Sequence, residues 1–289
     1  MKTVIIFVFF FFSFIAFSYS QTPLNIVVIG AHPDDADIRA GGTAIKYAQA
    51  GHNVLFVSLT NGDAGHHEKG GGALARIRRA EATEAGKRFG VEYIVLDNHD
   101  GELMPTLENR LEVIRLIRNW KADIVMGPRP NDYHPDHRNA AILVQDAAYM
   151  VIVPNVASNV PALEKNPVFL YTEDRFQKPY PFEPDIAVDI AAVYDQKVYA
   201  MAAHESQMFE WLPWTGQRLD QVPKTEAERL RWLAEGRKPR VSDNVRKSLA
   251  KWYGKDKAAN MDMAEAFEIC EYGRRPSDEE IKRLFPFFD

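Results

Sequence analysis

The sequence predicts an α/β fold: a Rossmann-like, mostly parallel sheet with helices on both faces and a metal site at the carboxyl ends of the strands. Short apolar runs alternate with segments of helical periodicity through the first half of the chain. Several helical segments stop at a glycine, such as Gly51 and Gly90, a common helix end. Strands and helices that alternate in this way indicate βαβ units, whose strands are parallel.

The elements can be placed along the chain from this periodicity. We expect strands at Leu24–Gly30, Val54–Thr60, Tyr93–Asp97 and Asp123–Gly127, and helices at Ile38–Ala50, Ala73–Phe89, Leu107–Trp120 and His137–Met150. Further strands are expected at Val168–Tyr171 and Ile186–Ile190, a helix at Val193–Ala203, and helices with long loops over residues 206–260. No Gly-, Ser- or Pro-rich linker divides the chain, so residues 21–289 are expected to form one domain with a helical and loop-rich C-terminal extension.

The first twenty residues differ from the rest. Lys2 is their only charge, an almost unbroken apolar run covers residues 4–17, and the small residues of Ser18-Tyr19-Ser20 precede Gln21. This pattern predicts a secretory signal peptide over residues 1–20, cleaved near Ser20-Gln21, and hence a secreted or periplasmic protein. An uncleaved N-terminal anchor is the alternative, whereas stable membrane insertion after cleavage is not expected.

Composition limits the classes of partner. Without residues 1–20 the chain has 34 basic and 40 acidic residues, a net charge of −6, which does not suit binding to nucleic acid. Cys270 is the only cysteine, so no intrachain disulfide can form. We therefore expect a small-molecule or glycan substrate; the sequence leaves self-association into a homo-oligomer open.

Two polar clusters follow predicted strands directly. The first strand leads into AHPDD at residues 31–35, and the fourth into PRPNDYHPDH at residues 128–137. Ligand sites in such sheets lie beyond the carboxyl ends of the strands, so the clusters converge if these strands are neighbours. Each motif alone is explained by ordinary turn chemistry, but both together favour a metal site. Histidine and carboxylate ligands suit zinc, and a catalytic zinc site has three protein ligands and one open position.

The two motifs resemble those of the LmbE-like, PIG-L-type N-acetylglucosaminyl deacetylase family. The resemblance extends from about Leu24 to His204 and implies a Rossmann-like sheet, one divalent ion per chain, usually zinc, and hydrolysis of amides of amino sugars. It implies that His32, Asp35 and His137 are the metal ligands. Asp34 matches the general base of the family.

The resemblance also assigns the remaining site residues. His134 matches the residue that stabilises the oxyanion or protonates the leaving amine, and Asp136 matches the carboxylate that orients it. Arg78 and Asp100 fall where the family contacts the sugar. Some sugar-specific members carry Tyr two residues before the acid histidine, where this chain has Asp132.

The neighbouring carboxylates Asp34 and Asp35 need different roles. Consecutive side chains of an extended segment point in opposite directions, so we expect only one of the two to face the metal. Two other features have ordinary alternatives. The glycine-rich segment Gly65–Gly72 is either a lid over the site or a surface loop, and the Trp211/Trp214 region is either a sugar platform or core packing.

The leading hypothesis is an exported zinc-dependent de-N-acetylase. A nucleotide-binding Rossmann protein would carry G-x-G-x-x-G after its first strand, where this chain has GAHPDD. A non-catalytic metal-dependent carbohydrate-binding protein would need the ligands but neither Asp34 nor His134. A metal-dependent amidase acting on a non-sugar substrate also stays open, because the sequence does not specify the acyl group or the sugar.

We predict that the mature protein begins near Gln21 and lies outside the cytoplasm, because Lys2 and the apolar run form an export signal. N-terminal sequencing of the protein from its native host measures this directly. An intact Met1 on a soluble cytoplasmic protein would contradict the prediction.

Overall fold

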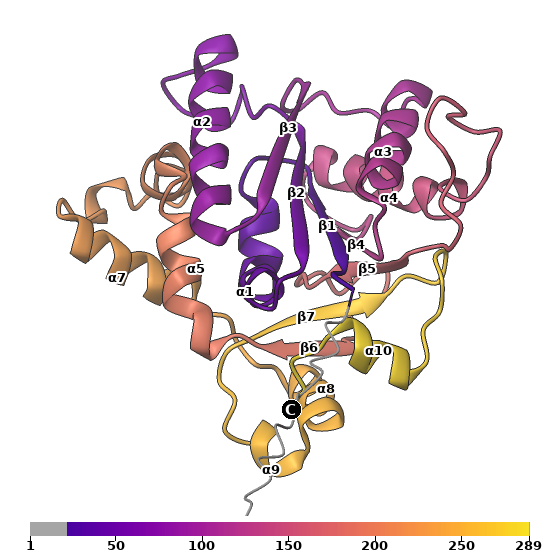
Figure 1. The fold of residues 1–289 in the computed structure, drawn as a ribbon. Helices are drawn as coiled ribbons and strands as arrows, with labels where there is room; N and C mark the ends of the chain where they lie inside the picture. The colour runs from indigo at the N-terminus through magenta and orange to yellow at the C-terminus, as the bar shows by residue number, and fades with distance from the viewer. Residues whose placement is uncertain (1–21, 289) are drawn as a thin grey trace, which may run out of the picture.

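The computed structural model describes residues 22–288 (Figure 1). The predicted signal peptide lies outside the described residues. Among those residues no helix is long and apolar enough to cross a bilayer.

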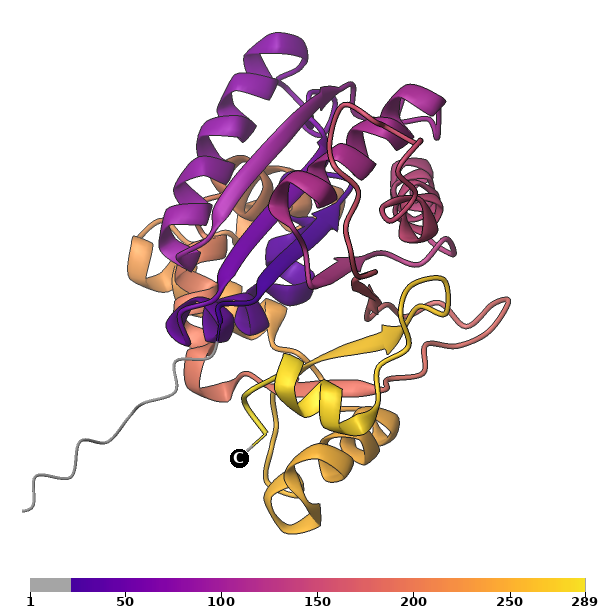
Figure 2. The same cartoon turned by 45° about the vertical axis from the view of Figure 1, so that its right-hand side comes forward.

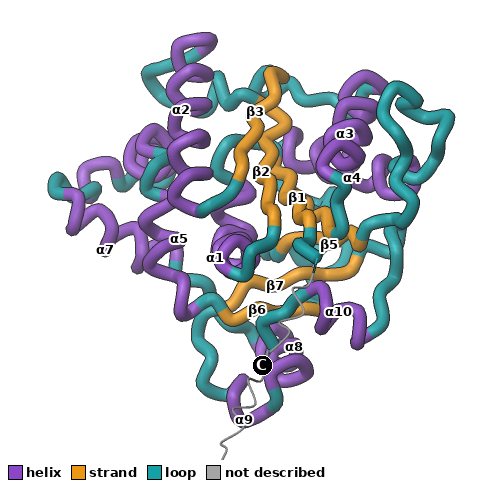
Figure 3. The backbone as a smooth tube through the Cα atoms, in the orientation of Figure 1, coloured by secondary structure: helices purple, strands orange, loops and turns teal. Residues whose placement is uncertain are grey.

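A seven-stranded mixed sheet forms the centre of the fold (Figure 3). Its strands, in the spatial order β3-β2-β1-β4-β5-β7-β6, are β3 (Glu92–Asn98), β2 (Asn53–Thr60), β1 (Asn25–Gly30), β4 (Ile124–Gly127), β5 (Val168–Thr172), β7 (Ala264–Ile269) and β6 (Ile186–Asp189). The five strands from β3 to β5 are parallel, and β7 runs antiparallel to both of its neighbours. The prediction of an α/β fold with a mostly parallel sheet is therefore confirmed.

The central position of β1 explains its sequence. Ile26 pairs with Val54 of β2 on one side and with Ile124 of β4 on the other. Ile26, Val27, Val28 and Ile29 are at most 2% exposed, which accounts for the uninterrupted apolar run that follows Asn25 in this strand. β1 and β4 are thus direct neighbours, the condition on which convergence of the two motifs depended.

Helices cover both faces of the sheet, as the βαβ pattern predicts (Figures 1 and 2). On one side lie α1 (Asp35–Gln49), α2 (Gly71–Phe89) and α5 (Tyr194–Met201), and on the other α3 (Leu107–Trp120) and α4 (Pro135–Met150). All these helices were expected from the sequence. Helix α1 begins three residues before the predicted start and α4 two residues before, so the catalytic motifs form the helix starts themselves.

The C-terminal region is more regular than the sequence suggested. It contains a π-helical turn (Ser206–Trp211), α6 (Leu212–Thr215), α7 (Glu226–Arg237), α8 (Asp243–Tyr253), α9 (Lys255–Ala258) and α10 (Asp278–Leu284). Short 3₁₀ turns occupy Ala191–Val193 and Leu219–Gln221. No strand was predicted after residue 190, yet β7 inserts between β5 and β6. Its AEAFEI sequence alternates acidic and apolar residues, and its pairing partners lie about eighty to a hundred residues earlier in the chain.

A buried ion pair attaches β7 to α1. Glu265 of β7 accepts hydrogen bonds from the backbone N–H groups of Gly42 (2.8 Å) and Thr43 (2.7 Å) in α1. Lys197 of α5 donates to Glu265 (2.7 Å) and to the carbonyl oxygen of Ile38 (2.8 Å). The side chains of Glu265 and Lys197 are 4% and 5% exposed, so each charge depends on the other for compensation.

We predict that Glu265→Gln lowers the free energy of unfolding by about 3–5 kcal/mol, because it leaves the Lys197 ammonium buried and uncompensated. The double variant Glu265→Gln, Lys197→Met should lose less than Glu265→Gln alone. Urea denaturation followed by circular dichroism measures both.

Glu271→Gln is the matched control, because the Glu271–Arg275 pair is exposed on both sides and such pairs contribute at most about 1 kcal/mol. Equal effects of the Glu265 and Glu271 substitutions would show that the buried pair does not anchor β7.

Candidate metal and catalytic site

The two polar motifs meet at the carboxyl edge of the central strands. Residues 31–34 form the turn that joins β1 to α1, and Asp35 opens α1. His134 caps α4 and His137 lies in its first turn. A side chain on Gly30 would place its Cβ 2.4 Å from the Cβ of Asp35, so glycine at this position lets the turn close tightly.

The three predicted metal ligands form a compact triangle of donor atoms. His32 Nδ1 lies 3.1 Å from His137 Nε2 and 3.6 Å from Asp35 Oδ2, and the third side, from His137 Nε2 to Asp35 Oδ2, is 3.5 Å. Tetrahedral zinc with bonds of about 2.0–2.1 Å separates its ligand atoms by about 3.3 Å. The donor triangle therefore has the dimensions of a zinc-sized site.

The ring nitrogens that face away from the triangle determine which histidine lone pairs point into it. His32 Nε2 contacts the carboxylates of Asp100 (3.0 Å) and Asp136 (3.3 Å), and His137 Nδ1 contacts Asp132 (3.0 Å). A ring nitrogen beside a carboxylate carries the proton, so in the neutral tautomers the inward nitrogens are unprotonated. Two lone pairs and a carboxylate oxygen then face one another, an arrangement that a cation stabilises.

The electrostatic field at the triangle favours positive charge. Burial opposes a charge on His32, but Asp100, Asp136 and Asp35 outweigh it and raise the pKa of His32 well above its usual value. Burial alone would raise the pKa of Asp35, yet His137 and His32 hold it far below the usual range. Asp35 also accepts from the N–H groups of Ala31 and His32, at 2.9 Å each, so its carboxylate is fixed in the ionised form.

Two further trios of side chains in the same cluster lie close enough to hold an ion: His32, His134 and His137, and His32, Asp100 and Asp136. In the first, His134 takes the place of Asp35. In the second trio, the carboxylates of Asp100 and Asp136 contact the outward nitrogen of His32. That nitrogen carries a proton when it donates to them, so it has no lone pair for an ion. The cluster is thus a candidate His/Asp metal site, and the His32–Asp35–His137 triangle is the one whose free lone pairs converge.

Asp34 lies beside the triangle in a strained backbone conformation. Its φ of 146° and ψ of −19° fall in a region that side-chain-bearing residues rarely adopt, at a cost of about 1–3 kcal/mol. The side chain is 9% exposed, and its Oδ1 lies 3.4 Å from Nη2 of Arg78. Burial raises the pKa of Asp34, with Arg78 opposing the shift, and a carboxylate whose pKa is raised toward neutrality is a better general base.

The reason for the different roles of Asp34 and Asp35 needs correction. We expected an extended segment in which alternate side chains diverge, but residues 31–34 form a turn and Asp35 is helical. The positive φ of Asp34, not strand alternation, separates the two carboxylates.

His134 is oriented by the backbone of its own helix. Its Nδ1 accepts from the N–H of Asp136 (3.2 Å), so the neutral ring carries its proton on Nε2. Burial and the neighbouring His32 and His137 lower its pKa, which favours that neutral form. The ring stands edge-on to His32, 4.7 Å between centroids, and can present an N–H donor at the site.

Asp136 has different contacts from those we expected. The resemblance assigned its carboxylate to orienting His134, but the structure places Asp136 Oδ2 3.3 Å from His32 Nε2. The same carboxylate accepts from the N–H groups of Gly101 (2.7 Å) and Leu103 (3.2 Å). These contacts follow from the position of Asp136 in the first turn of α4, where its side chain faces the loop after β3 and is fully buried.

The two predicted sugar-contacting residues lie on the Asp34 side of the triangle. Arg78 is 2% exposed and donates to the carbonyl oxygen of Pro33 (2.8 Å), while Asp100 contacts His32. Gly65 packs between them: a Cβ there would lie 2.9 Å from Arg78 Nη1 and 3.1 Å from Asp100 Oδ2. The buried Arg78 therefore supports Asp34.

The glycine-rich segment Gly65–Gly72 is attached to the C-terminal region. His66 (2.7 Å) and Lys69 both contact the carboxylate of Glu210, and His67 stacks on Trp214, 5.0 Å between centroids. Both histidines of the segment are thus engaged with residues of the C-terminal region, while its backbone borders Arg78 and Asp100.

Sequence reasoning missed the contribution of Asp132. Its Oδ1 contacts His137 Nδ1 and accepts from the backbone N–H of His134, at 3.0 Å each. We had noted this residue only as a departure from the tyrosine of some family members. A carboxylate five residues before a predicted ligand was the available signal, but its direction depends on the turn that leads into α4.

The fold and the site define an α/β protein with a candidate metal site of two histidines and a carboxylate at the strand ends. Residues 27–148 match the family described as PIG-L, GlcNAc-PI de-N-acetylase. The chain is also 34% identical over 204 residues to the diacetylchitobiose deacetylase of Thermococcus kodakarensis, covering 66% of this chain and 73% of that enzyme. This chain belongs to the PIG-L (LmbE-like) family.

Other similarities show how broad the family is. The chain is 25% identical over 239 residues to the 4-oxalmesaconate hydratase of Pseudomonas putida, covering 76% of this chain and 92% of that enzyme. In three dimensions it resembles the N,N'-diacetylchitobiose deacetylase of Pyrococcus horikoshii with a TM-score of 0.63, 23% identity and 88% coverage of each chain. The structural likeness confirms the fold.

We predict about one divalent metal ion per chain, lost when the donor triangle is broken. The double variant Asp35→Ala, His137→Ala removes two corners of the triangle and should reduce metal content at least several-fold. Elemental analysis of the purified protein measures it.

The double variant Asp97→Ala, His99→Ala is the matched control, because it removes the same residue types from exposed positions. Full metal content in the Asp35/His137 variant would place the ion elsewhere.

Proposed function

We propose that this protein is an exported zinc-dependent de-N-acetylase that hydrolyses the amide of an N-acetylated amino sugar or glycoconjugate. The donor triangle of His32, Asp35 and His137, with Asp34 beside it, is the observation that carries the proposal. The similarity to diacetylchitobiose deacetylase supports an amino-sugar substrate.

The reaction adds water across an amide. The water oxygen bonds to the acyl carbon, the carbon–nitrogen bond breaks, and the products are a carboxylate and an amine that has gained a proton. Zinc held by the triangle would polarise the acyl oxygen and acidify water as a Lewis acid. The chain's own side chains must then take a proton from water and deliver one to nitrogen.

Asp34 is the residue we assign to proton removal. Its carboxylate is buried, carries a raised pKa and lies next to the triangle without belonging to it. The strained backbone and Arg78 hold it in one orientation, so no reorganisation is needed before the proton moves. His134, protonated on Nε2, is the donor that meets the developing oxyanion or the departing nitrogen.

The sugar is expected on the side of Arg78 and Asp100. Gly65 lies against both residues and adds no side chain there. Asp100 contacts His32 and also borders the expected sugar position, so a sugar hydroxyl that bonds to Asp100 is fixed relative to the metal ligand His32. Export before catalysis remains part of the proposal and rests on the N-terminal sequence.

Hydration of a carbon–carbon double bond is a second candidate, favoured by the similarity to 4-oxalmesaconate hydratase over most of both chains. Both reactions activate water, so the metal ligands and Asp34 do not discriminate between them. The measurement that does is release of free amine from a panel of N-acylated sugars, compared with loss of ultraviolet absorbance from unsaturated dicarboxylates.

We predict opposite behaviour of the two neighbouring carboxylates. Asp34→Asn should keep the metal and lower amide turnover about 10²–10⁴-fold, because it removes the base without removing a ligand. Asp35→Asn should lose metal, and added zinc should restore part of its turnover. Metal content and amine release are measured together for each variant.

Loss of metal in Asp34→Asn with retention in Asp35→Asn would reverse the two roles. Unchanged turnover in both variants would refute hydrolysis at this site.

A further inference from the structure

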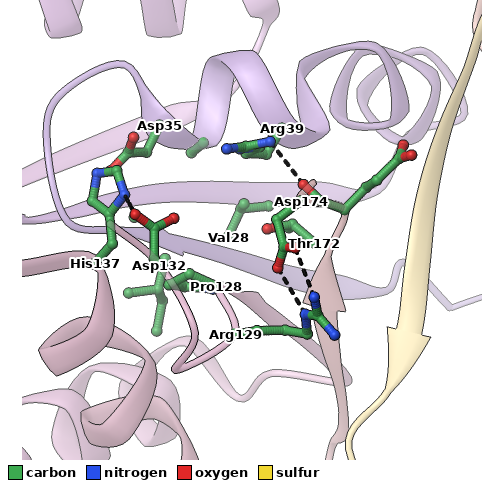
Figure 4. Close-up of a pocket in the computed structure, with 13 residues that line it drawn as sticks. Val28, Asp35, Arg39, Pro128, Arg129, Asp132, His137, Thr172 and Asp174 are labelled. Atoms are coloured by element: carbon green, nitrogen blue, oxygen red, sulfur yellow. Dashed lines mark hydrogen bonds and ion pairs between the residues drawn. The ribbon is translucent and has the colours of Figure 1, made fainter. Parts of the chain in front are cut away.

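A small cavity lies beside the donor triangle. It lies between β1, α1 and the ends of β4 and β5, with the metal ligands Asp35 and His137 at one end (Figure 4). Arg39 of α1 forms part of its wall. The position of this cavity matches the crevice beyond strand ends in which α/β sheets bind ligands.

The charges around the cavity are paired, except those of Arg39 and Glu173. Arg129 binds Asp174 through two hydrogen bonds of 2.7 Å, and Asp132 contacts His137. Arg39 donates to the backbone carbonyl oxygen of Glu173 (2.8 Å). Among residues 22–288, Arg39 has no carboxylate within ion-pair distance, so its guanidinium keeps donors for a ligand.

Glu173, the remaining carboxylate of the wall, opposes an anion only weakly at neutral pH. Burial raises the pKa of Glu173 to about 7, with Arg39 and Arg175 acting against the shift. About half of the Glu173 side chains are therefore uncharged near that pH. The charge that an incoming ligand meets in the cavity is thus the positive charge of Arg39.

Apart from Thr172, the rest of the wall is apolar, and the space is small. Val28, Ala36 and Pro128 line it beside the triangle. The cavity volume of about 30 Å³ corresponds to about two water molecules. An apolar wall, a guanidinium and this volume fit a short-chain carboxylate, with its methyl group on Val28 and its oxygens toward Arg39.

We propose that this cavity binds the acyl group of the substrate and the carboxylate released from it, with Arg39 as the carboxylate-binding residue and the cavity size restricting the acyl group to about two carbons. The proposal rests on the proposed amide hydrolysis. It places the released carboxylate beside Arg39, whereas the amine is expected beside Arg78.

Acetate binding tests the carboxylate site without turnover. Titration of the metal-loaded protein with ¹³C-labelled acetate, followed by NMR, should give an affinity that falls about tenfold or more in Arg39→Gln, because a charge-assisted hydrogen bond is lost. Arg39→Lys should lose less, since it keeps the charge but not the planar fork. Arg115→Gln, on the far helix α3, should bind acetate like the parent protein.

The acyl-length restriction is tested by enlarging the cavity. Val28→Ala should raise the rate ratio of N-propionyl to N-acetyl glucosamine hydrolysis several-fold, with folding checked by circular dichroism. An unchanged ratio would overturn the restriction, and unchanged acetate affinity in Arg39→Gln would overturn the binding site. If the parent protein binds acetate through Arg39 but releases no amine from any N-acyl sugar, the carboxylate site stands and the proposed hydrolysis fails.

Discussion

The site depends on one constraint: two imidazoles and a carboxylate must turn their lone pairs toward the same point. Such an arrangement is unfavourable without a cation, and in this protein it is imposed by a surrounding layer of acids. Asp100 and Asp136 hold the outer nitrogen of His32, and Asp132 holds that of His137. Each carboxylate fixes a tautomer, and the fixed tautomers direct the remaining lone pairs inward.

The sheet supplies the precision that this arrangement needs. Parallel pairing of β1 with β4 brings residues about a hundred positions apart to the same edge. The apolar side chains of β1 and β4 are buried on both faces of the sheet, and this close packing keeps the edge in place. The helix starts after each strand then carry the ligands: Asp35 opens α1, and His137 follows the proline that begins α4.

Backbone strain and buried charges both occur beside the donor triangle. Asp34 has an unusual backbone conformation and a raised pKa, and its partner Arg78 is almost fully buried. Neighbouring polar contacts stabilise this arrangement: His204 contacts Asp37 at 2.9 Å, and Ser206 binds Glu81 twice. His204 and Ser206 thus support helices α1 and α2, which adjoin the site. Residues far from the metal in sequence therefore determine how well the base is held.

The sequence by itself determined the layered fold, eleven of the helices and strands, and the residues of the two motifs. These follow from local rules: apolar periodicity marks strands and helices, and polar clusters directly after strands mark the site.

Tertiary structure decided the rest. The strand β7 depends on pairing with β5 and β6, which local periodicity does not reveal. Asp132 contacts His137, and Asp136 contacts His32, because of how the turn before α4 packs on the loop after β3. Arg39 lines a cavity only because β1, β4 and α1 enclose that space. Side-chain direction at a turn and the shape of an enclosed space arise from contacts between distant segments, and no spacing along the chain encodes them.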